Sequence, residues 1–250
     1  MLSKAKARWI KSLQVKKYRL AEQRFTVEGA KSVAELLASS LKVEWVIGTR
    51  SFLDDHADLL RNRSIQFDEV TPEELQSVGA FQTNDAALAV AVIPASEPFS
   101  WQRGEWVLAL DDIRDPGNLG TMLRIADWYG ILHVLASAGT ADLYNSKVIT
   151  ASMGSFLRVT VHYVDLAAVL RSAPGKVLGA MLNGTSVYDY SFGPDGGVIV
   201  IGNEAHGVSP EVQATFNGSL TIPRVGQAES LNAAVATAIL LDNMTRNSRP

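Results

Sequence analysis

The chain has no cysteine among its 250 residues, and it has only four histidines. Without thiols it forms no disulfide and offers neither a thiolate metal ligand nor a thiol nucleophile. No apolar run approaches the roughly 18 residues that span a membrane, and the basic N-terminus lacks the apolar core of a signal peptide. These absences predict a cytoplasmic protein with no membrane contact and no metal site.

Positive charge is scarce except at the N-terminus. Residues 1–24 contain eight Lys or Arg and one acid, Glu22, so this arm carries +7. Because the whole chain carries −3, the remaining residues carry −10. A basic arm on an acidic body predicts a polyanionic partner, since each neutralised phosphate releases counterions. A solvated charged helix is the alternative, and Trp9 and Tyr18 are suited either to stack on bases or to pack internally.

The first half alternates helical and strand patterns. We expect helices over residues 3–14, 30–39, 51–60 and 71–78, and strands over residues 24–29, 43–49, 65–70 and 86–93. The helix at 71–78 has a Thr cap, a Pro at its first position and a Glu at its third. The segment PASEPFSWQRGE then interrupts the pattern. We therefore expect a small α/β domain over 1–93, a linker over 94–105 and a second domain over 106–250.

The second half is more apolar. We expect buried strands over residues 106–112, 132–137, 176–182 and 197–202, and helices over residues 119–129, 145–151, 163–171, 209–216 and 230–246. Apolar strands alternating with helices predict an α/β fold with a parallel sheet covered on both faces. Ligands bind beyond the carboxyl ends of such strands. Three polar or glycine-rich segments lie there, at 111–124, 202–210 and 222–236.

Each of these segments also has an ordinary structural explanation. The loop at 202–210 fits a turn between a strand and a helix, and Ser230 fits a helix cap. Arg124 fits an ion pair with one of three acids, Asp111, Asp112 or Asp127. The GNLG stretch matches neither phosphate-loop pattern, and no G-x-S-x-G elbow surrounds Ser230. Nucleotide binding by the usual loops and a serine nucleophile are therefore disfavoured.

Taken together, the three segments match a family. The chain resembles the SpoU (TrmH-type) RNA ribose 2′-O-methyltransferases of the SPOUT class. Its first motif, N-x-G-x-x-x-R, starts at Asn118 and ends at Arg124; the second, G-N-E-x-x-G, spans 202–207; the third, I-P-x-x-G-x-x-x-S-L-N, spans 222–232. The first half, with KKYRLAEQRFTVEGAKSVAELL, resembles the RNA substrate-binding extension of that family, which has a ribosomal-protein (L30e-like) fold.

The resemblance implies a methyltransferase that moves a methyl group from S-adenosylmethionine to a ribose 2′-oxygen. It implies a deep trefoil knot in the catalytic domain, 23S ribosomal RNA as the substrate and a homodimer packed through the catalytic domain. A transfer-RNA substrate, or an inactive RNA-binding member of the family, are the alternatives. The Ala-rich final helix fits dimer packing and intrachain packing equally well.

The resemblance also implies roles for particular residues. The catalytic set is Arg124, Asn118, Glu204, Ser230 and Asn232; the cofactor-binding set is Ala180, Met181, Leu182, Gly202, Asn203, Gly207, Ile222, Pro223, Gly226 and Leu231; the RNA-binding set is Lys4, Arg8, Lys16, Lys17, Arg19 and Glu28. Arg124 either removes the hydroxyl proton or clamps the neighbouring phosphate. Glu204 is the one carboxylate of the catalytic set suited to take that proton. Thr150 and Arg224 stand where the family usually has Arg and Met.

Overall fold

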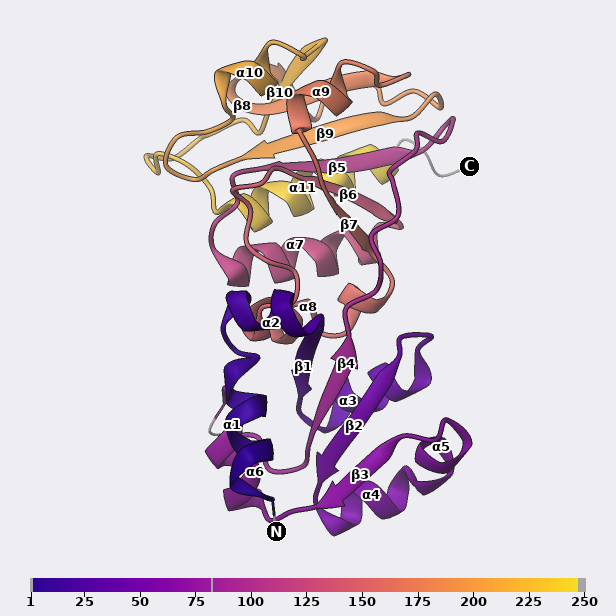
Figure 1. The fold of residues 1–250 in the computed structure, drawn as a ribbon. Helices are drawn as coiled ribbons and strands as arrows, with labels where there is room; N and C mark the ends of the chain where they lie inside the picture. Colours follow the sequence, from indigo (N-terminus) through magenta and orange to yellow (C-terminus); the bar gives the residue numbers. More distant parts are fainter. Residues whose placement is uncertain (1, 82, 247–250) are drawn as a thin grey trace. The chain divides into compact units, whose positions relative to one another are not determined.

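The computed structural model describes residues 2–81 and 83–246. The chain forms two compact units, traced from indigo to yellow in Figure 1. The first unit contains residues 1–95 and 144–157, and the second contains residues 96–143 and 158–250. Residues 144–157 fall within the second domain expected from the sequence, 106–250, but they pack with the first unit. No helix among the described residues has the length and apolarity needed to cross a membrane.

The first unit is built on a four-stranded sheet. Its strands, in spatial order, are β1 (Arg24–Glu28), β4 (Ala87–Val92), β2 (Val43–Gly48) and β3 (Gln66–Glu69). β4 runs antiparallel to both of its neighbours, and β2 and β3 are parallel. α1 (Lys4–Ser12) and α6 (Pro72–Val78) pack together on one side through a shared apolar cluster that includes Ile10, Leu75 and Leu88. The predicted start of α6 is confirmed, because Thr71 and Glu74 form a reciprocal capping box.

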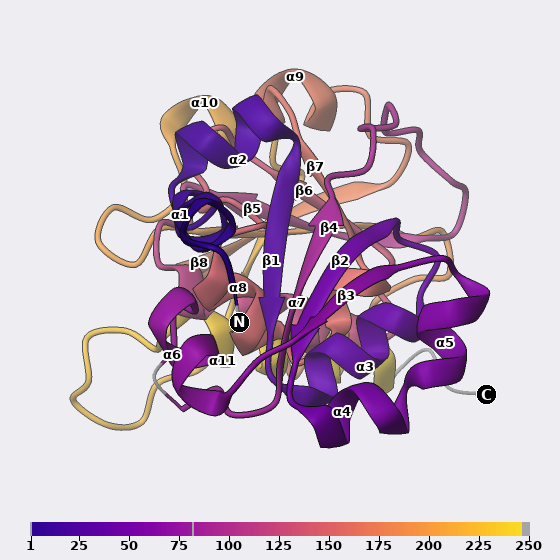
Figure 2. The same ribbon diagram turned by 60° about the horizontal axis from the view of Figure 1, so that its bottom comes forward.

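Three further groups of elements complete this unit (Figure 2). α3 (Ala30–Ala38) packs on β1 and β4, and α4 (Arg50–Asp55) and α5 (Ala57–Asn62) follow β2. α2 (Lys16–Glu22), which the sequence analysis did not predict, contacts β1. α8 (Ser146–Ser152) and the 3₁₀ turn η1 (Ser155–Leu157) also belong to this unit. The centroid of the Phe25 ring, on β1, lies 4.5 Å from that of Tyr144 and 6.2 Å from that of Phe156.

The second unit is a parallel six-stranded sheet with helices on both faces. Its strands, in spatial order, are β10 (Gly218–Thr221), β8 (Lys176–Ser186), β9 (Gly197–Gly202), β5 (Trp106–Asp111), β6 (His133–Ala136) and β7 (Thr160–Tyr163). α7 (Pro116–Trp128) and α11 (Ala233–Arg246) lie on one side of the sheet, and α9 (Leu166–Leu170) and α10 (Pro210–Gln213) lie on the other (Figure 1). The predicted α/β fold with a parallel sheet is confirmed.

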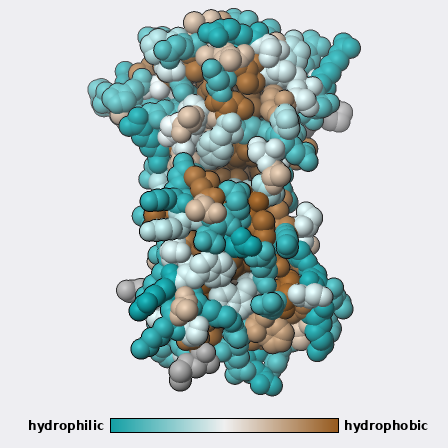
Figure 3. All heavy atoms as spheres, viewed as in Figure 1, coloured by the Kyte–Doolittle hydropathy of each residue, from teal (hydrophilic) through white to brown (hydrophobic). Residues whose placement is uncertain are grey.

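Burial on both faces of this sheet explains its apolar strands. Val107 and Ala109 of β5 pack under α9 and α10, and Leu108 and Leu110, which alternate with them, are fully buried on the opposite face. Polar residues cover most of the visible surface, and apolar residues appear there in small groups (Figure 3). The core thus fixes where each strand ends, and the polar segments begin at those ends.

Candidate active site

The site lies at the carboxyl ends of β5 and β9, the two central strands. These strands are paired along their whole length, and the last pair joins Asp111 to Gly202. The first and second motifs therefore leave the sheet side by side, as the parallel arrangement predicts. Asp111 also accepts a hydrogen bond from the backbone N–H of Ser209 at 2.7 Å, which ties the end of β5 to the loop after β9.

The first motif forms the start of α7. Asp115 is the N-cap, its carboxylate accepting from the backbone N–H of Asn118 at 2.8 Å, and Pro116 occupies the first helical position. Because the cap and the proline fix the start, the helix begins three residues before the predicted residue 119. Asn118 consequently lies in the first helical turn rather than in a preceding loop.

A chain of side-chain hydrogen bonds joins all three motifs. The Asn118 amide donates to the carboxylate of Glu204, which belongs to the second motif. The Asn118 carbonyl oxygen accepts from Asn232 Nδ2, in the third motif, at 2.9 Å. Asn118 therefore uses both ends of its amide, and three residues from distant parts of the chain form one polar cluster.

The second motif is a tight turn held by its own side chain and backbone. Asn203 and Gly207 form an antiparallel bridge, and Asn203 Oδ1 accepts from the backbone N–H of Ala205 at 2.8 Å. A Cβ at Gly202 would lie 2.3 Å from the carbonyl carbon of Gly207, so only glycine fits there. Gly207 itself has φ of +69°. The turn fixes Glu204 at its tip, beside Asn118.

Asp112, directly after β5, holds the second-motif turn in place through hydrogen bonds. It is one of four described non-glycine residues with positive φ, at +59°. Its carbonyl oxygen accepts from Asn203 Nδ2 at 2.8 Å, its N–H donates to Ser137 Oγ at 2.8 Å, and its carboxylate accepts from Arg114 Nε at 2.9 Å. That hydrogen bond raises the pKa of Arg114. Sequence reasoning did not assign Asp112 or Ser137 to the site; the paired acids at the end of a strand were the available signal.

Arg124 projects from the exposed side of α7. The helix buries Leu119, Met122 and Leu123 on its other sides, so Arg124 is not surrounded by apolar groups. Within the described part of the chain Arg124 forms no ion pair. The three acids considered as partners are engaged elsewhere: Asp111 with Ser209, Asp112 with Arg114, and Asp127 with Arg158 at 2.8 Å.

The third motif is an exposed loop that ends at α11. Val225 is fully exposed and Leu231 is 46% exposed. Arg224 Nη1 donates to the carbonyl of Ala228 at 3.1 Å and so bridges the loop. Ser230 fits a helix cap by sequence, but α11 begins at Ala233, and Asn232 Oδ1 accepts from the backbone N–H of Ala234 at 2.9 Å. Asn232 thus fills the capping role.

The remaining residues of the expected cofactor-binding set lie along β8 and after β10. The register between these strands jumps, with Ser219 paired to Gly179 and Leu220 paired to Thr185, so residues 180–184 bulge out of the pairing. Thr221 Oγ1 donates to the carbonyl of Leu182 at 3.0 Å and holds the bulge. Because β8 also pairs with β9 up to Gly179, this bulge starts beside the end of β9. Ile222 and Pro223 follow β10 directly.

The expected RNA-binding residues divide into two groups. Lys4, Arg8, Lys16 and Lys17 are exposed on α1 and α2. Arg19 is 2% exposed and donates to the carbonyls of Leu13 and Gln14 at 3.0 and 2.8 Å. Glu28 is 8% exposed and accepts from the backbone N–H of Ala80 at 2.8 Å. Burial raises the pKa of Glu28.

Burial removes Arg19 and Glu28 from the surface that RNA would contact. Arg19 joins α1 to α2 because its guanidinium satisfies the carbonyls at the end of α1. Glu28 satisfies the backbone of the turn after α6. Both are structural residues in this fold, which corrects their assignment as RNA contacts.

Comparison with known proteins gives matches over both units. Residues 105–242 match the SpoU rRNA Methylase family, and residues 4–89 match the MRM3-like substrate binding domain. A Bacillus subtilis protein named 23S rRNA (guanosine(2553)-2′-O)-methyltransferase RlmP is 32% identical over 237 residues, which cover 92% of each chain. A Streptomyces viridochromogenes 23S rRNA (uridine(2479)-2′-O)-methyltransferase is 28% identical over 243 residues, covering 87% of this chain and 81% of the other.

A solved structure matches along nearly the whole length. It is the AdoMet-bound rRNA methyltransferase from Sinorhizobium meliloti, with a TM-score of 0.90 and 26% sequence identity, covering 100% of this chain and 97% of the other.

Proposed function

The chain belongs to the SpoU rRNA methylase family and is an RNA 2′-O-methyltransferase, and we propose that it methylates a ribose of 23S ribosomal RNA. The observation that carries the proposal is the Glu204–Asn118–Asn232 cluster, which unites the polar residues of all three motifs. The two relatives named as 23S rRNA enzymes, each aligned over most of its length, support ribosomal RNA over transfer RNA.

The proposed methyl donor is S-adenosylmethionine, which supplies an electrophilic methyl group on a sulfonium. The solved structure of the Sinorhizobium meliloti rRNA methyltransferase has this compound, AdoMet, bound. The chain's own geometry fits it, because the bulge at 180–184 presents backbone groups beside β9, and the turn around Gly202 leaves no room for a side chain. The residues proposed to line the cofactor site are Ala180, Met181, Leu182, Gly202, Asn203, Gly207, Ile222, Pro223, Gly226 and Leu231.

In the proposed reaction the ribose 2′-oxygen would form the new bond to the methyl carbon while the bond between that carbon and the sulfonium sulfur breaks, and the proton of the hydroxyl must leave. Glu204 is an exposed carboxylate at the tip of the second-motif turn, and it is the proposed proton acceptor. Asn118 fixes the carboxylate, and Asn232 in turn fixes Asn118. Ser230 is exposed next to this cluster in sequence and is proposed to hydrogen-bond the ribose. These steps use no metal.

Arg124 is proposed to clamp a backbone phosphate rather than to remove the proton. A guanidinium has a pKa above about 12, so it is a poor base at neutral pH. It does offer two parallel N–H donors that match phosphate oxygens. Arg124 is exposed and free of ion pairs with described residues, as a group that awaits a substrate phosphate should be. The clamp would align the 2′-oxygen with the methyl carbon.

The remaining proposals concern partners. Lys4, Arg8, Lys16 and Lys17 are exposed on consecutive helices of the substrate-binding unit and are proposed to contact RNA phosphates.

A homodimer packed through the catalytic unit is proposed as well. Trp128 at the end of α7 is 82% exposed, and burial of this large ring against a second copy is a favourable use of it. The knot expected in the same unit stays a prediction.

The test is methyl transfer from tritiated S-adenosylmethionine to transcribed 23S rRNA, with bulk transfer RNA as the parallel substrate. We expect incorporation into 23S rRNA at a single nucleotide, located by mapping 2′-O-methyl groups. Incorporation into transfer RNA alone would replace the proposed substrate. Binding of RNA with neither cofactor binding nor incorporation would identify an inactive RNA-binding member.

A further inference from the structure

A cleft of about 500 Å³ opens on the first unit, and none of its lining residues belongs to the three motifs. It is formed where α1 passes over the beginning of β2 and β3. Its lining comes from three short stretches of chain, namely Lys6 and Trp9, then Lys42, Val43, Glu44 and Trp45, then Arg63, Ser64 and Gln66. A volume of this size is within the range of ligand sites, about 300 to 1,000 Å³.

The charge of the cleft is positive. Three cations, Lys6, Lys42 and Arg63, line it against one lining carboxylate, Glu44, and Asp68 pairs with Lys6 from outside the lining. Glu44 already accepts from Arg24 at 2.5 and 3.0 Å. The hydrogen bond from Arg24 is the main reason that the pKa of Glu44 is lowered. Lys42 lies 3.7 Å from Glu44, and its side chain is 75% exposed. Lys42 is therefore a cation at the rim that has a weak partner and is open to an anion from solvent.

The floor of the cleft is aromatic. The Trp9 and Trp45 rings stack with centroids 6.1 Å apart and an interplanar angle of 27°. Trp45 is 6% exposed, and its indole N–H donates to Asp68 Oδ2 at 2.9 Å, so that ring is fixed. Trp9 is half-buried and lines the cleft. Trp9 stacks on this fixed ring and keeps part of its own surface open, so it offers a platform on which a flat, apolar ring can stack.

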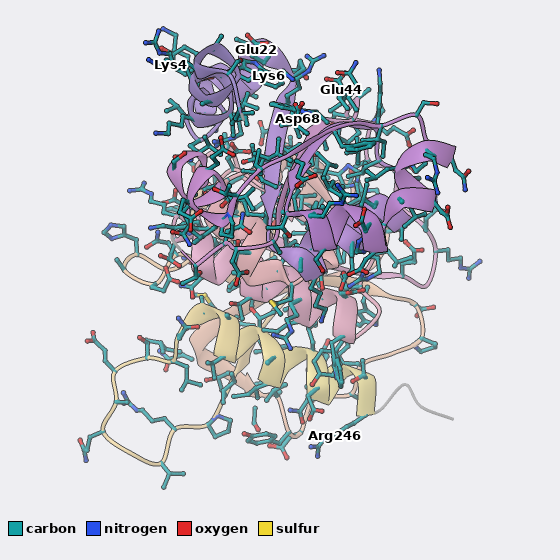
Figure 4. All side chains as sticks on the ribbon, turned by 90° about the horizontal axis from the view of Figure 1, so that it is seen from below. Lys4, Lys6, Glu22, Glu44, Asp68 and Arg246 are labelled. Carbon is teal, nitrogen blue, oxygen red and sulfur yellow. The ribbon has the colours of Figure 1, made fainter. Side chains whose placement is uncertain are left out.

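Lys6 links the aromatic floor to the charged rim. Its ammonium lies 4.4 Å from the centroid of the Trp45 ring and 2.7 Å from Asp68 Oδ2. Figure 4 shows Lys6 beside Asp68, with Glu44 on the same side of the unit. Arg63 steadies the opposite wall, because it donates to the carbonyl of Leu37 at 2.6 Å and that of Leu41 at 2.5 Å. The turn that carries Lys42 is thus fixed before any ligand arrives.

We infer that this cleft binds an unpaired nucleotide of the RNA substrate, with its base against Trp9 and its phosphate at Lys42. The inference rests on the proposed RNA substrate and adds a specific contact to it. Aromatic stacking with nearby cations is how proteins hold single-stranded nucleic acid. Paired bases hide both faces in the helix stack, so a duplex cannot use Trp9 in this way. The preferred RNA therefore has a loop, bulge or flipped base that lies over this unit.

The test compares two lysines of the same unit. Lys42 lines the cleft and Lys31 lies on α3; their side chains are 75% and 72% exposed, and each has one distant acid, at 3.7 and 3.9 Å. Binding of a fluorescein-labelled 12-nucleotide single-stranded RNA to the full chain would be followed by anisotropy at several salt concentrations. We expect Lys42→Gln to weaken binding about fivefold near 0.1 M salt and to lower the salt dependence by about one phosphate contact. Lys31→Gln should bind like the parent protein.

The aromatic part of the inference has its own variant and readout. Trp9→Leu keeps an apolar side chain but removes the ring, and we expect about tenfold weaker binding of the single strand. Because Trp9 packs on Trp45, the thermal unfolding midpoint of this variant is measured alongside. Photo-crosslinking of the parent protein to the same RNA carrying 4-thiouridine provides a readout that does not depend on a variant, and mass spectrometry should locate the adduct on the cleft residues.

The outcomes separate this inference from the proposed function. Equal binding by Lys42→Gln, Lys31→Gln and the parent protein, with adducts elsewhere, overturns the cleft as a binding site while methyl transfer remains intact. Tighter binding of a duplex of the same sequence overturns the unpaired nucleotide as the occupant. Loss of all RNA binding and methyl transfer by the parent protein overturns the proposed function itself.

Discussion

The exposure of Arg124 changes the role that its sequence neighbours would indicate. Among Leu, Ile and Ala in the sequence its charge looks costly, but α7 turns it away from the core. Residues 117, 121 and 124 lie on one side of this helix because a helix repeats every 3.6 residues. With the nearby acids engaged by other groups, the guanidinium is available for a ligand.

Arg124→Ala should lower kcat for methyl transfer about 100-fold, because a ribose without its clamp is poorly aligned. Arg124→Lys should recover part of the loss, since it restores the charge without the bidentate geometry. Initial rates at varied RNA concentration give kcat and KM for each variant. Arg171→Ala is the matched control, an exposed arginine of the same unit just after α9, and it should behave like the parent protein. If the Arg124→Ala variant has the kcat of the parent protein, Arg124 does not clamp the RNA phosphate.

Glu204→Gln separates the charge of the side chain from its shape. A glutamine oxygen can still accept from Asn118, so the cluster should remain in place. The proton acceptor is lost, and kcat should fall by roughly 10² to 10⁴ with little change in RNA affinity. Glu211→Gln, an exposed carboxylate in the first turn of α10, serves as the control. Parental turnover by Glu204→Gln would falsify the assignment of Glu204 as the proton acceptor.

Among the elements, the turn after β5 depends on one strained residue. Asp112 has φ of +59°, a conformation that aspartate tolerates and β-branched residues strongly resist. Asp112→Val should lower the free energy of unfolding by about 1 to 3 kcal/mol from backbone strain, with a further loss from the broken contact to Arg114. Asp112→Gly removes the same carboxylate without that strain and should lose less. Urea denaturation measures both variants, and equal losses would contradict a role for strain.

A pair of histidines, the buried His162 and the half-buried His133, links two neighbouring strands of the sheet, β6 and β7. His133 Nδ1 lies 3.1 Å from His162 Nε2, and Phe99 of the preceding linker packs on both rings. Burial, and then the neighbouring His133, lowers the pKa of His162. The folded chain therefore binds fewer protons here than the unfolded chain. The stabilisation is present above the unfolded pKa of about 6.5 and is lost as the pH falls toward the folded pKa.

Urea unfolding midpoints between pH 5 and pH 7.5 test this effect of pH. The parent protein should lose stability on acidification, and His162→Gln should lose less over the same interval because it cannot be protonated. His206→Gln is the control, since His206 is exposed in the second-motif turn. A parental slope that His162→Gln leaves unchanged would assign the pH dependence to other groups.

The sequence predicts elements well where local signals and burial agree. The helix at 30–39 and the strand at 43–49 appear as α3 and β2 with nearly the same ends. The four-residue strand β7 was not predicted, because only one of its residues, His162, is buried and the segment contains no apolar run. The bulge at 180–184 could not be predicted from the sequence either, because a jump in register depends on how two strands pair and not on the sequence of one of them.

In the site, too, the residues marked by local sequence signals were predicted and those fixed by packing were not. Three motifs at the ends of parallel strands predict that Asn118, Glu204 and Asn232 converge, and hydrogen bonds join them in the structure. The burial of Arg19 was not predictable from a run of basic residues. It follows from the turn between α1 and α2, whose carbonyls need a donor.

For the whole molecule, the boundary between units does not follow the order of the chain. Residues 144–157 lie inside the stretch that matches the SpoU rRNA Methylase family, 105–242, yet they pack with the first unit. The chain therefore passes from one unit to the other three times. The fully buried Phe25 needs Tyr144 and Phe156 as neighbours, so residues 1–95 alone lack part of their core.

Phe156→Ala should therefore destabilise the first unit, although residue 156 is far in sequence from residues 1–95, which form most of that unit. Replacing a buried Phe with Ala costs about 3 to 5 kcal/mol. We expect amide hydrogens of β1 to exchange faster, because the ring over Phe25 is removed. Phe192→Ala is the matched control, since Phe192 is similarly buried, at 5% against 6% for Phe156, and packs on Trp106 in the second unit. It should accelerate exchange in β9 and spare β1. Faster exchange in β9 than in β1 for Phe156→Ala would place this segment energetically with the second unit, against the packing around Phe25.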